Sequence, residues 1–166
     1  MPQMRLPSIQ VGDQPFHTRE ETSKYTDMMP DGKSYQFSMR MDVKSVILSP
    51  SGGGKIKPGA MDISGIAWTG HGRVKAVDVS VDGGRNWREA TLQAPVLSKA
   101  LTRFRLPWRW DGTPTVIQSR AVDEHGYVQP TRQALVAVRG QQFFYHYNGI
   151  QSWRIAANGE VSNVHA

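Results

Sequence analysis

The stretch 61-MDISGIAWTGHGRVKAVDVSVDGGRNW-87 alternates in side-chain character along two successive segments, one before and one after a glycine pair. In the first segment two sets of side chains point to opposite faces, with Ile63, Gly65, Ala67 and Thr69 on one face and Ser64, Ile66 and Trp68 on the other. Residues 74–79 alternate in the same way. A period of two predicts β-strands, and apolar residues on both faces indicate that one face enters a core while the other is partly covered.

Two turns are encoded in the same stretch. Gly70 and Gly72 flank His71 where the chain has to reverse direction. Residues 82–84 (DGG) supply the positive-φ positions that a tight hairpin needs, because a side chain there would clash with the backbone. Trp87 follows directly and is predicted to pack under this turn.

Outward from this stretch, further short apolar segments recur at regular spacing with turn signals between them. The predicted strands cover about seven segments, which include residues 43–49, 88–93, 101–110, 113–123 and, as the last core strand, 133–139. No segment with a helical period lies between them, so the pattern predicts an all-β, immunoglobulin-like (E-set) antiparallel β-sandwich over residues 43–140. Pro107 lacks a ladder donor, so its strand should be bulged or unpaired on one side at that point.

The two ends of the chain differ from this pattern. Residues 1–42 are polar and irregular, with a short helix expected near 18–25, a turn at 28–33 and a short strand near 37–41. Residues 141–166 form an aromatic C-terminal tail, in which Asn148-Gly149 and Asn158-Gly159 predict two small hairpins. The tail aromatics could meet another protein or could cover an open end of the sandwich.

Composition excludes several classes of function. The net charge is +6 with a pI near 9.8, but Lys and Arg are scattered singly, so no nucleic-acid partner is expected. No apolar run approaches the roughly 18 residues of a membrane span, so no membrane partner is expected either. The five histidines are far apart in the sequence, and the Ser-Gly-Gly-Gly-Lys run at 51–55 lacks the spacing of a phosphate loop. An active site contained in this chain therefore has no motif to support it.

Several quoted segments resemble one family. The runs GIAWTGHGR (65–73), VDVSVDGGRNW (77–87), ALTRFRLPWRW (100–110), QSRAVDEHGYVQP (118–130) and YHYNGIQSWR (145–154) are similar to the C-terminal dimerisation domain of the sulfite-oxidase family of molybdopterin oxidoreductases. The later segments resemble most the molybdenum subunit of bacterial sulfane (sulfur) dehydrogenases. On this resemblance, residues 1–42 are the remnant of the molybdenum domain and the bridge from it, residues 43–140 the dimerisation domain, and residues 141–166 the tail.

The resemblance implies particular site residues. The family binds an anionic sulfur substrate with arginines and a tyrosine near the molybdenum, and one arginine comes from an Arg-Gly dipeptide of the dimerisation domain, which here is Arg139. A guanidinium suits this task because it is permanently charged and presents paired donors to an oxyanion. Tyr25 matches the family's pocket tyrosine. The alternatives are a surface ion pair for Arg139 and a tyrosine lying against the sandwich for Tyr25.

The resemblance also implies a function. The family holds its molybdenum through a cysteine thiolate, and this chain has no cysteine, so no cofactor and no metal ligand are expected in the chain itself. The chain is expected to form a homodimer and to complete the substrate pocket of a molybdenum-molybdopterin enzyme that oxidises sulfite or sulfane sulfur and passes electrons to a c-type cytochrome. The family's bacterial members imply a periplasmic location. The alternative is a stand-alone Ig-like interaction module without redox chemistry.

Overall fold

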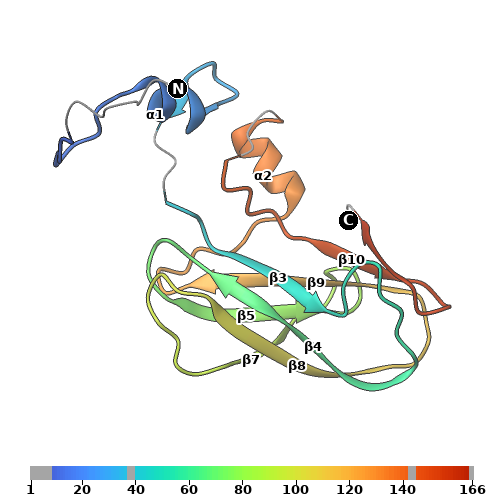
Figure 1. The fold of residues 1–166 in the computed structure, drawn as a ribbon. Helices are drawn as coiled ribbons and strands as arrows, with labels where there is room; N and C mark the ends of the chain where they lie inside the picture. Colours follow the sequence, from blue (N-terminus) through green and yellow to red (C-terminus); the bar gives the residue numbers. More distant parts are fainter. Residues whose placement is uncertain (1–8, 37–39, 142–144, 165–166) are drawn as a thin grey trace, which may run out of the picture.

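The computed structural model describes residues 9–36, 40–141 and 145–164, and these form a β-sandwich with a smaller helical and hairpin region at one end (Figure 1). One sheet has four strands in the order β3-β4-β8-β7, namely β3 (Lys44–Ser49), β4 (Gly59–Trp68), β8 (Thr102–Trp110) and β7 (Thr91–Leu92). The other has five in the order β11-β10-β9-β5-β6, namely β11 (Val161–Val164), β10 (Ser152–Ile155), β9 (Thr115–Asp123), β5 (Val74–Ser80) and β6 (Arg88–Glu89). The pairing between neighbouring strands is antiparallel, so the predicted all-β, immunoglobulin-like sandwich is confirmed.

Strand β4 supplies the centre of the four-stranded sheet, and its side chains alternate as the sequence predicts. Ile63, Gly65 and Ala67 are buried, while the residues between them are half-buried on the outer face. The register places Ile63 opposite Leu106 and Gly65 opposite Phe104 of β8. The inward side chains of both sheets meet in one core, whose largest members include Phe104, Ile63, Ile117, Ile155 and Trp110.

Pro107 lies where strand β8 has a neighbour on one side only. On one side it faces Asp62 of β4. On the other side, the described pairing of β7 is limited to Thr91 with Arg105 and Leu92 with Phe104, so β7 ends before reaching Pro107. A missing ladder donor therefore costs little there, and the predicted one-sided pairing at Pro107 is confirmed.

The predicted core strand at 133–139 is wrong, because these residues form helix α2 (Arg132–Arg139). Thr131 caps the helix by accepting a hydrogen bond from the Ala134 amide at 3.2 Å, and Gly140, with φ of 81°, ends it. Within α2 the buried residue is Leu135, so the helix packs on the rest of the protein through a small part of its surface. The edge of β9 is instead covered by β10.

The C-terminal tail becomes part of the five-stranded sheet. Its hairpin β10–β11 turns at Asn158-Gly159 and pairs Ile155 with Val161, which confirms one of the two predicted hairpins. The other, at Asn148-Gly149, is wrong, because the described residues 145–151 contain no strand and Asn148 is buried, donating to the Val43 carbonyl at 3.3 Å. Trp153 of the tail packs on the core and donates to the Ile47 carbonyl at 3.3 Å. The described tail therefore covers the sandwich, while Phe143 and Phe144 lie outside the described residues.

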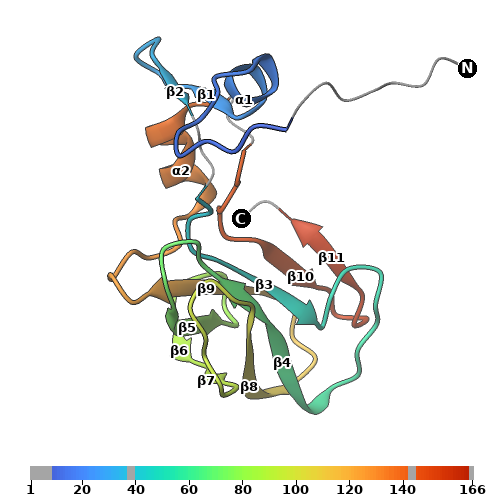
Figure 2. The ribbon, with the colours of Figure 1, turned by 60° about the vertical axis from the view of Figure 1, so that its left-hand side comes forward.

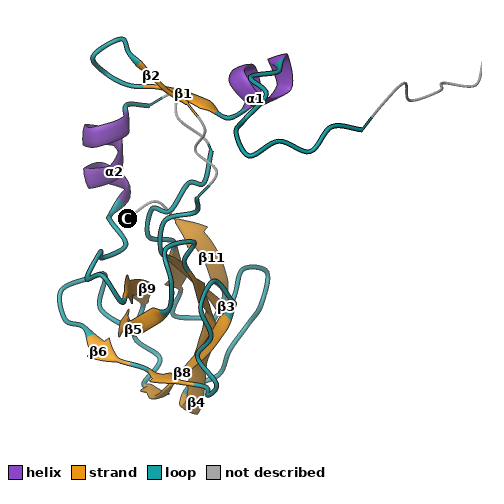
Figure 3. Ribbon diagram, turned by 90° about the vertical axis from the view of Figure 1, so that its left-hand side faces the viewer, coloured by secondary structure: helices purple, strands orange, loops and turns teal. Residues whose placement is uncertain are grey.

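Helix α1 (Arg19–Lys24) confirms the helix expected near 18–25. Strands β1 (Thr26–Met28) and β2 (Ser34–Gln36) then form a hairpin whose turn, with the Gly32 amide bonded to the Met29 carbonyl at 3.0 Å, confirms the turn at 28–33. The strand expected near 37–41 falls mainly on residues 37–39, which lie outside the described residues. Figures 2 and 3 show α1, the β1–β2 hairpin and α2 together at one end of the sandwich.

The turn after β5 is held by the carboxylate of Asp82. It accepts from the Asn86 amide at 2.9 Å, the Arg85 amide at 3.1 Å and the Asn86 side-chain amide at 2.7 Å. The backbone bond from Asn86, followed by the side-chain bonds from Asn86 and Ser80, lowers the pKa of Asp82 from 3.8 to about 2. Trp87 donates to the Gly84 carbonyl at 3.0 Å, so its predicted position under the turn is confirmed.

We expect Asp82→Asn to lower the melting temperature at pH 7 and to have a much smaller effect at pH 2. A carboxyl group whose folded pKa is depressed stabilises the fold above its unfolded value, here 3.8, and loses this contribution as the pH falls toward about 2. The difference between mutant and parent should therefore shrink between pH 4 and pH 2 in thermal melts followed by circular dichroism. Asp13→Asn, in the exposed N-terminal segment, is the control. A constant difference across this range would show that the turn does not depend on the carboxylate charge.

Candidate functional site

Arg139 lies in the last turn of α2 and forms an ion pair with Asp42 through Nη2 and Oδ2. The other carboxylate oxygen of Asp42 lies 3.4 Å from Nε2 of His71. We call these three residues the Asp42 cluster. The side chains of Arg139 and Asp42 are 20% and 21% exposed, and that of His71 is 35% exposed, so the cluster sits partly sheltered at the surface.

Backbone contacts explain why residues so far apart in sequence meet in the Asp42 cluster. The Gly70 amide donates to the Met41 carbonyl at 2.7 Å, which places the segment before β3 against the β4–β5 turn. That turn is braced by the His71 amide, which bonds Thr69 Oγ1 at 3.1 Å, and by a 2.8 Å contact between the His125 ring and the His71 carbonyl. The turn therefore presents the His71 ring toward Asp42.

In the Asp42 cluster Arg139 forms an ion pair, as the alternative to an anion-binding role predicted. A guanidinium carries five donors, so an ion pair with one carboxylate is compatible with binding an oxyanion as well. Asp42 also limits the positive charge that an anion would meet, because a carboxylate and a guanidinium together carry no net charge. Anion binding by Arg139 remains a prediction.

Tyr25 lies between α1 and β1 and packs against Tyr145 of the tail, with ring centroids 5.2 Å apart at an interplanar angle of 35°. Burial, followed by the charges of Tyr25, Asp27 and Glu20, raises the pKa of Tyr145. Tyr25 is 43% exposed, and the ring it contacts belongs to the tail. Its role as a substrate-pocket tyrosine remains a prediction.

Tyr25 and Arg139 belong to segments that meet above the sandwich. The β1–β2 hairpin and α2 enclose a hollow of about 460 Å³ whose lining includes Pro30, Tyr35, Ala137 and Val138. Figure 2 shows this hairpin beside α2, with α1 next to it. The segments that carry Tyr25 and Arg139 therefore lie at the same end of the sandwich, but neither side chain lines this hollow.

The residues that the structure describes contain no group of three or more His, Cys, Asp or Glu side chains arranged to hold a metal ion. None of the helices in the described ranges is long and apolar enough to cross a membrane.

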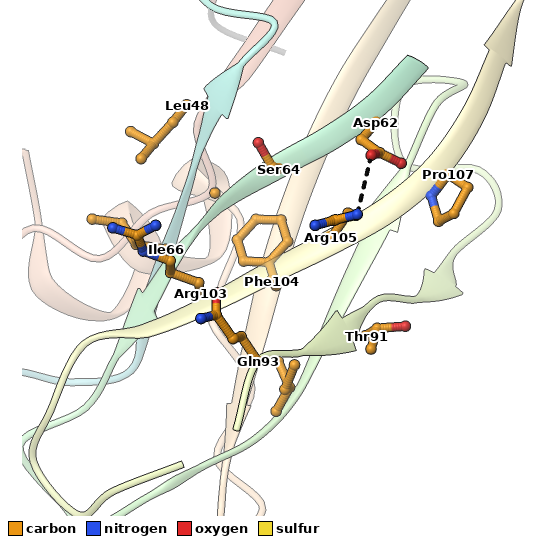
Figure 4. A pocket seen from close by; sticks show the side chains of 12 residues that line it. Leu48, Asp62, Ser64, Ile66, Thr91, Gln93, Arg103, Phe104, Arg105 and Pro107 are labelled. Atoms are coloured by element: carbon orange, nitrogen blue, oxygen red, sulfur yellow. Dashed lines mark ion pairs between the residues drawn. The ribbon is translucent and has the colours of Figure 1, made fainter. Parts of the chain in front are cut away.

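The outer face of the four-stranded sheet forms a separate surface, which we call the outer sheet face. It borders a hollow of about 910 Å³ whose lining includes Leu48, Asp62, Ser64, Ile66, Arg103 and Arg105 (Figure 4). Asp62 and Arg105 form an ion pair across neighbouring strands at 3.5 Å. Leu48 is 54% exposed beside them. This surface therefore combines exposed apolar side chains with charges of both signs.

Comparisons with known proteins agree on one family. Residues 35–152 match the model of the Mo-co oxidoreductase dimerisation domain. Sulfite oxidase from Gallus gallus is 39% identical over 97 residues, which cover 54% of this chain and 21% of that protein. Sulfite oxidase from Arabidopsis thaliana is 34% identical over 103 residues, which cover 55% of this chain and 26% of that protein.

A solved structure extends this similarity to nearly the whole chain. The sulfane dehydrogenase SoxCD from Paracoccus pantotrophus is 54% identical, with a TM-score of 0.89 over 93% of this chain and 40% of that one. The chain therefore spans well under half of the length of the proteins it matches.

Proposed function

Because the chain belongs to the Mo-co oxidoreductase dimerisation domain family, we propose that it serves as the dimerisation domain of a molybdenum enzyme that oxidises a sulfur compound. The observation that carries this proposal is the 0.89 TM-score and 54% identity with sulfane dehydrogenase SoxCD over 93% of the chain. The sulfite oxidases that match the same region support sulfur as the element oxidised.

The residues of this chain do not fit a molybdenum-molybdopterin site. There is no cysteine in the sequence to supply a thiolate, and the described residues hold no metal-binding group. Cofactor binding and the redox step therefore belong to another domain, and the chain is proposed to be inactive alone. Its contribution would be to pair subunits and to present Arg139 and Tyr25 to an anionic sulfur substrate.

The outer sheet face is the surface we propose for pairing with a second copy. It exposes Leu48, and it carries Asp62 together with Arg103 and Arg105. A twofold axis brings the same patch of two subunits together, so a surface bearing both signs of charge can complement itself. The half-buried Ile66 lies on this face beside Arg103 and would contribute apolar contact.

We expect Ile66→Glu to weaken the dimer of the assembled enzyme at least about tenfold, because an unpaired charge buried in an interface is costly to desolvate. Sedimentation velocity over a dilution series measures this change. Lys75→Glu, exposed on β5 in the other sheet, is the matched control and should leave the dimer intact. A dimer unaffected by Ile66→Glu would place the interface elsewhere.

The electron acceptor and the compartment are part of the same proposal. A c-type cytochrome as acceptor and a periplasmic location follow from the likeness to bacterial sulfane dehydrogenases. The basic balance of the chain, with a net charge of +6, favours docking to an acidic protein.

Native mass spectrometry with metal analysis tests the proposed function. The protein is recovered from its host with antibody to this chain. A heavy assembly that contains molybdenum supports the proposal. A metal-free monomer or dimer overturns it and favours the alternative, a stand-alone Ig-like interaction module.

A further inference from the structure

Asp27 is a carboxylate buried without a hydrogen-bond partner among the described residues. It lies in the middle of β1, opposite Tyr35 of β2, and is 3% exposed. Neither of its side-chain oxygens is hydrogen-bonded by any described residue. The Asp42 cluster and the outer sheet face do not include it, so it serves none of the roles described above.

A carboxylate in this position is expensive unless a cation accompanies it. Removing an ionised carboxylate from water costs far more than removing a neutral polar group, and buried charges in proteins are therefore paired or bound to metals. Among the described residues, Asp27 belongs to no group of three or more His, Cys, Asp or Glu side chains that could hold a metal ion. An organic cation is the simpler partner.

The neighbours of Asp27 also favour a cation. Tyr25, two residues earlier, and Tyr145 of the tail form an aromatic pair. Asp27 and Glu20 of α1 both act electrostatically on Tyr145, so two acidic side chains lie near this ring. Aromatic faces and carboxylates together suit a guanidinium or an ammonium group, which binds both.

The nearby cations of the chain are directed elsewhere. Arg139, at the end of α2, is paired with Asp42. Lys33 of the β1–β2 turn lies 3.8 Å from Asp31. Lys24 is exposed at the end of α1. No described cation bonds either oxygen of Asp27, so its partner is sought outside this chain.

We propose that Asp27, with Tyr25 and Tyr145 beside it, receives an arginine or lysine side chain of the catalytic domain that this chain serves. This proposal rests on the proposed function, because it takes its partner from that enzyme. The segment around β1 is then a docking point between this chain and the rest of that enzyme, in addition to any role in the substrate pocket.

The test uses Asp27→Asn, which keeps the shape of the side chain and removes its charge, in two settings. In the chain alone the carboxylate has no described partner, so we expect the substitution to raise the melting temperature by about 2 to 4 °C. In the molybdenum-containing assembly the same substitution leaves the partner's buried cation without a carboxylate to pair with. We therefore expect association of the two parts to weaken at least about tenfold, or the melting temperature of the assembly to fall.

Asp31→Asn on the same hairpin is the matched control. Because Asp31 is exposed, this substitution should change neither the melting temperature of the chain nor the stability of the assembly. Destabilisation of the chain alone by Asp27→Asn would show that the carboxylate is satisfied within the chain, and would overturn the proposal. An assembly that is as stable with the Asp27→Asn variant as with the parent chain would also overturn it, while leaving the proposed function intact. Failure to isolate any molybdenum-containing assembly overturns the proposed function and, with it, the identity of the partner.

Discussion

Gly65→Ala is expected to lower the melting temperature of the protein by about 6 to 12 °C. Gly65 is buried in β4 between β3 and β8, and a Cβ atom there would lie 2.1 Å from the Val46 carbonyl oxygen and 2.5 Å from Cζ of Phe104. The Phe104 ring can turn, but the carbonyl belongs to the backbone of β3, so the two strands would have to separate. Overpacking typically costs about 1 to 3 kcal/mol, and a clash with backbone belongs at the upper end, so at about 2 to 4 °C per kcal/mol in a protein of this size the loss is about 6 to 12 °C.

Two further variants separate the causes of this loss. Ser64→Ala changes the neighbouring residue on the outer face of the same strand and should alter the melting temperature little. Adding Phe104→Leu to Gly65→Ala removes the contact with the ring but leaves the clash with the Val46 carbonyl. The second substitution should therefore not restore the loss of melting temperature that this backbone clash causes. A melting temperature unchanged by Gly65→Ala would contradict the close approach of β3 and β4.

The second large effect concerns Arg139. In the complete enzyme, Arg139→Ala is expected to lower kcat/KM for sulfite or another sulfur oxyanion by about 10- to 100-fold, because hydrogen bonds to charged groups contribute about 1.5 to 3 kcal/mol each. Arg139→Lys should recover part of this loss, since an ammonium keeps the charge but not the paired donors. Steady-state kinetics measures both variants, and a loss mainly in KM would identify binding as the step affected.

Arg132→Ala is the control for Arg139. It removes an exposed arginine at the opposite end of α2 and should leave the kinetics unchanged. The melting temperature should be recorded as well, because Arg139→Ala also breaks the ion pair with Asp42, a partly exposed pair that contributes about 1 kcal/mol at most. Kinetics unaffected by Arg139→Ala, together with a small loss of stability, would assign Arg139 to the structural ion pair alone.

The sandwich could be predicted from sequence because its signals are local. The alternation along β4, the glycines of its turn and the DGG turn after β5 each act over a few residues, and the structure follows them. The one-sided pairing at Pro107 could also be predicted, because proline has no backbone N–H to donate to a second neighbouring strand.

Helix α2 shows where local signals compete. The run ALVAV is apolar enough to suit a strand, yet Thr131 as N-cap and Gly140 as the final residue enclose a helix of eight residues. These caps were visible in the sequence. What could not be seen was that β10, from residues 152–155, occupies the edge of β9 and leaves no place for a strand there.

The candidate site is harder to predict because it depends on long-range contacts. Arg139 and Asp42 are 97 residues apart, and His71 reaches Asp42 only because the β4–β5 turn is bonded to the Met41 carbonyl. Asp27 gave no signal of its own, since a single aspartate in a short strand resembles any exposed acid until its burial is known.

The place of β10 in the five-stranded sheet has a consequence for synthesis on the ribosome. Strand β9 can pair with β5 as soon as residues 74–123 have emerged, but its other edge stays open until residues 152–155 follow. During that interval the nascent chain carries an uncovered strand edge and a partly exposed core, the features that favour aggregation. Translation through the codons for residues 124–155 is therefore the interval in which a chaperone has most to protect.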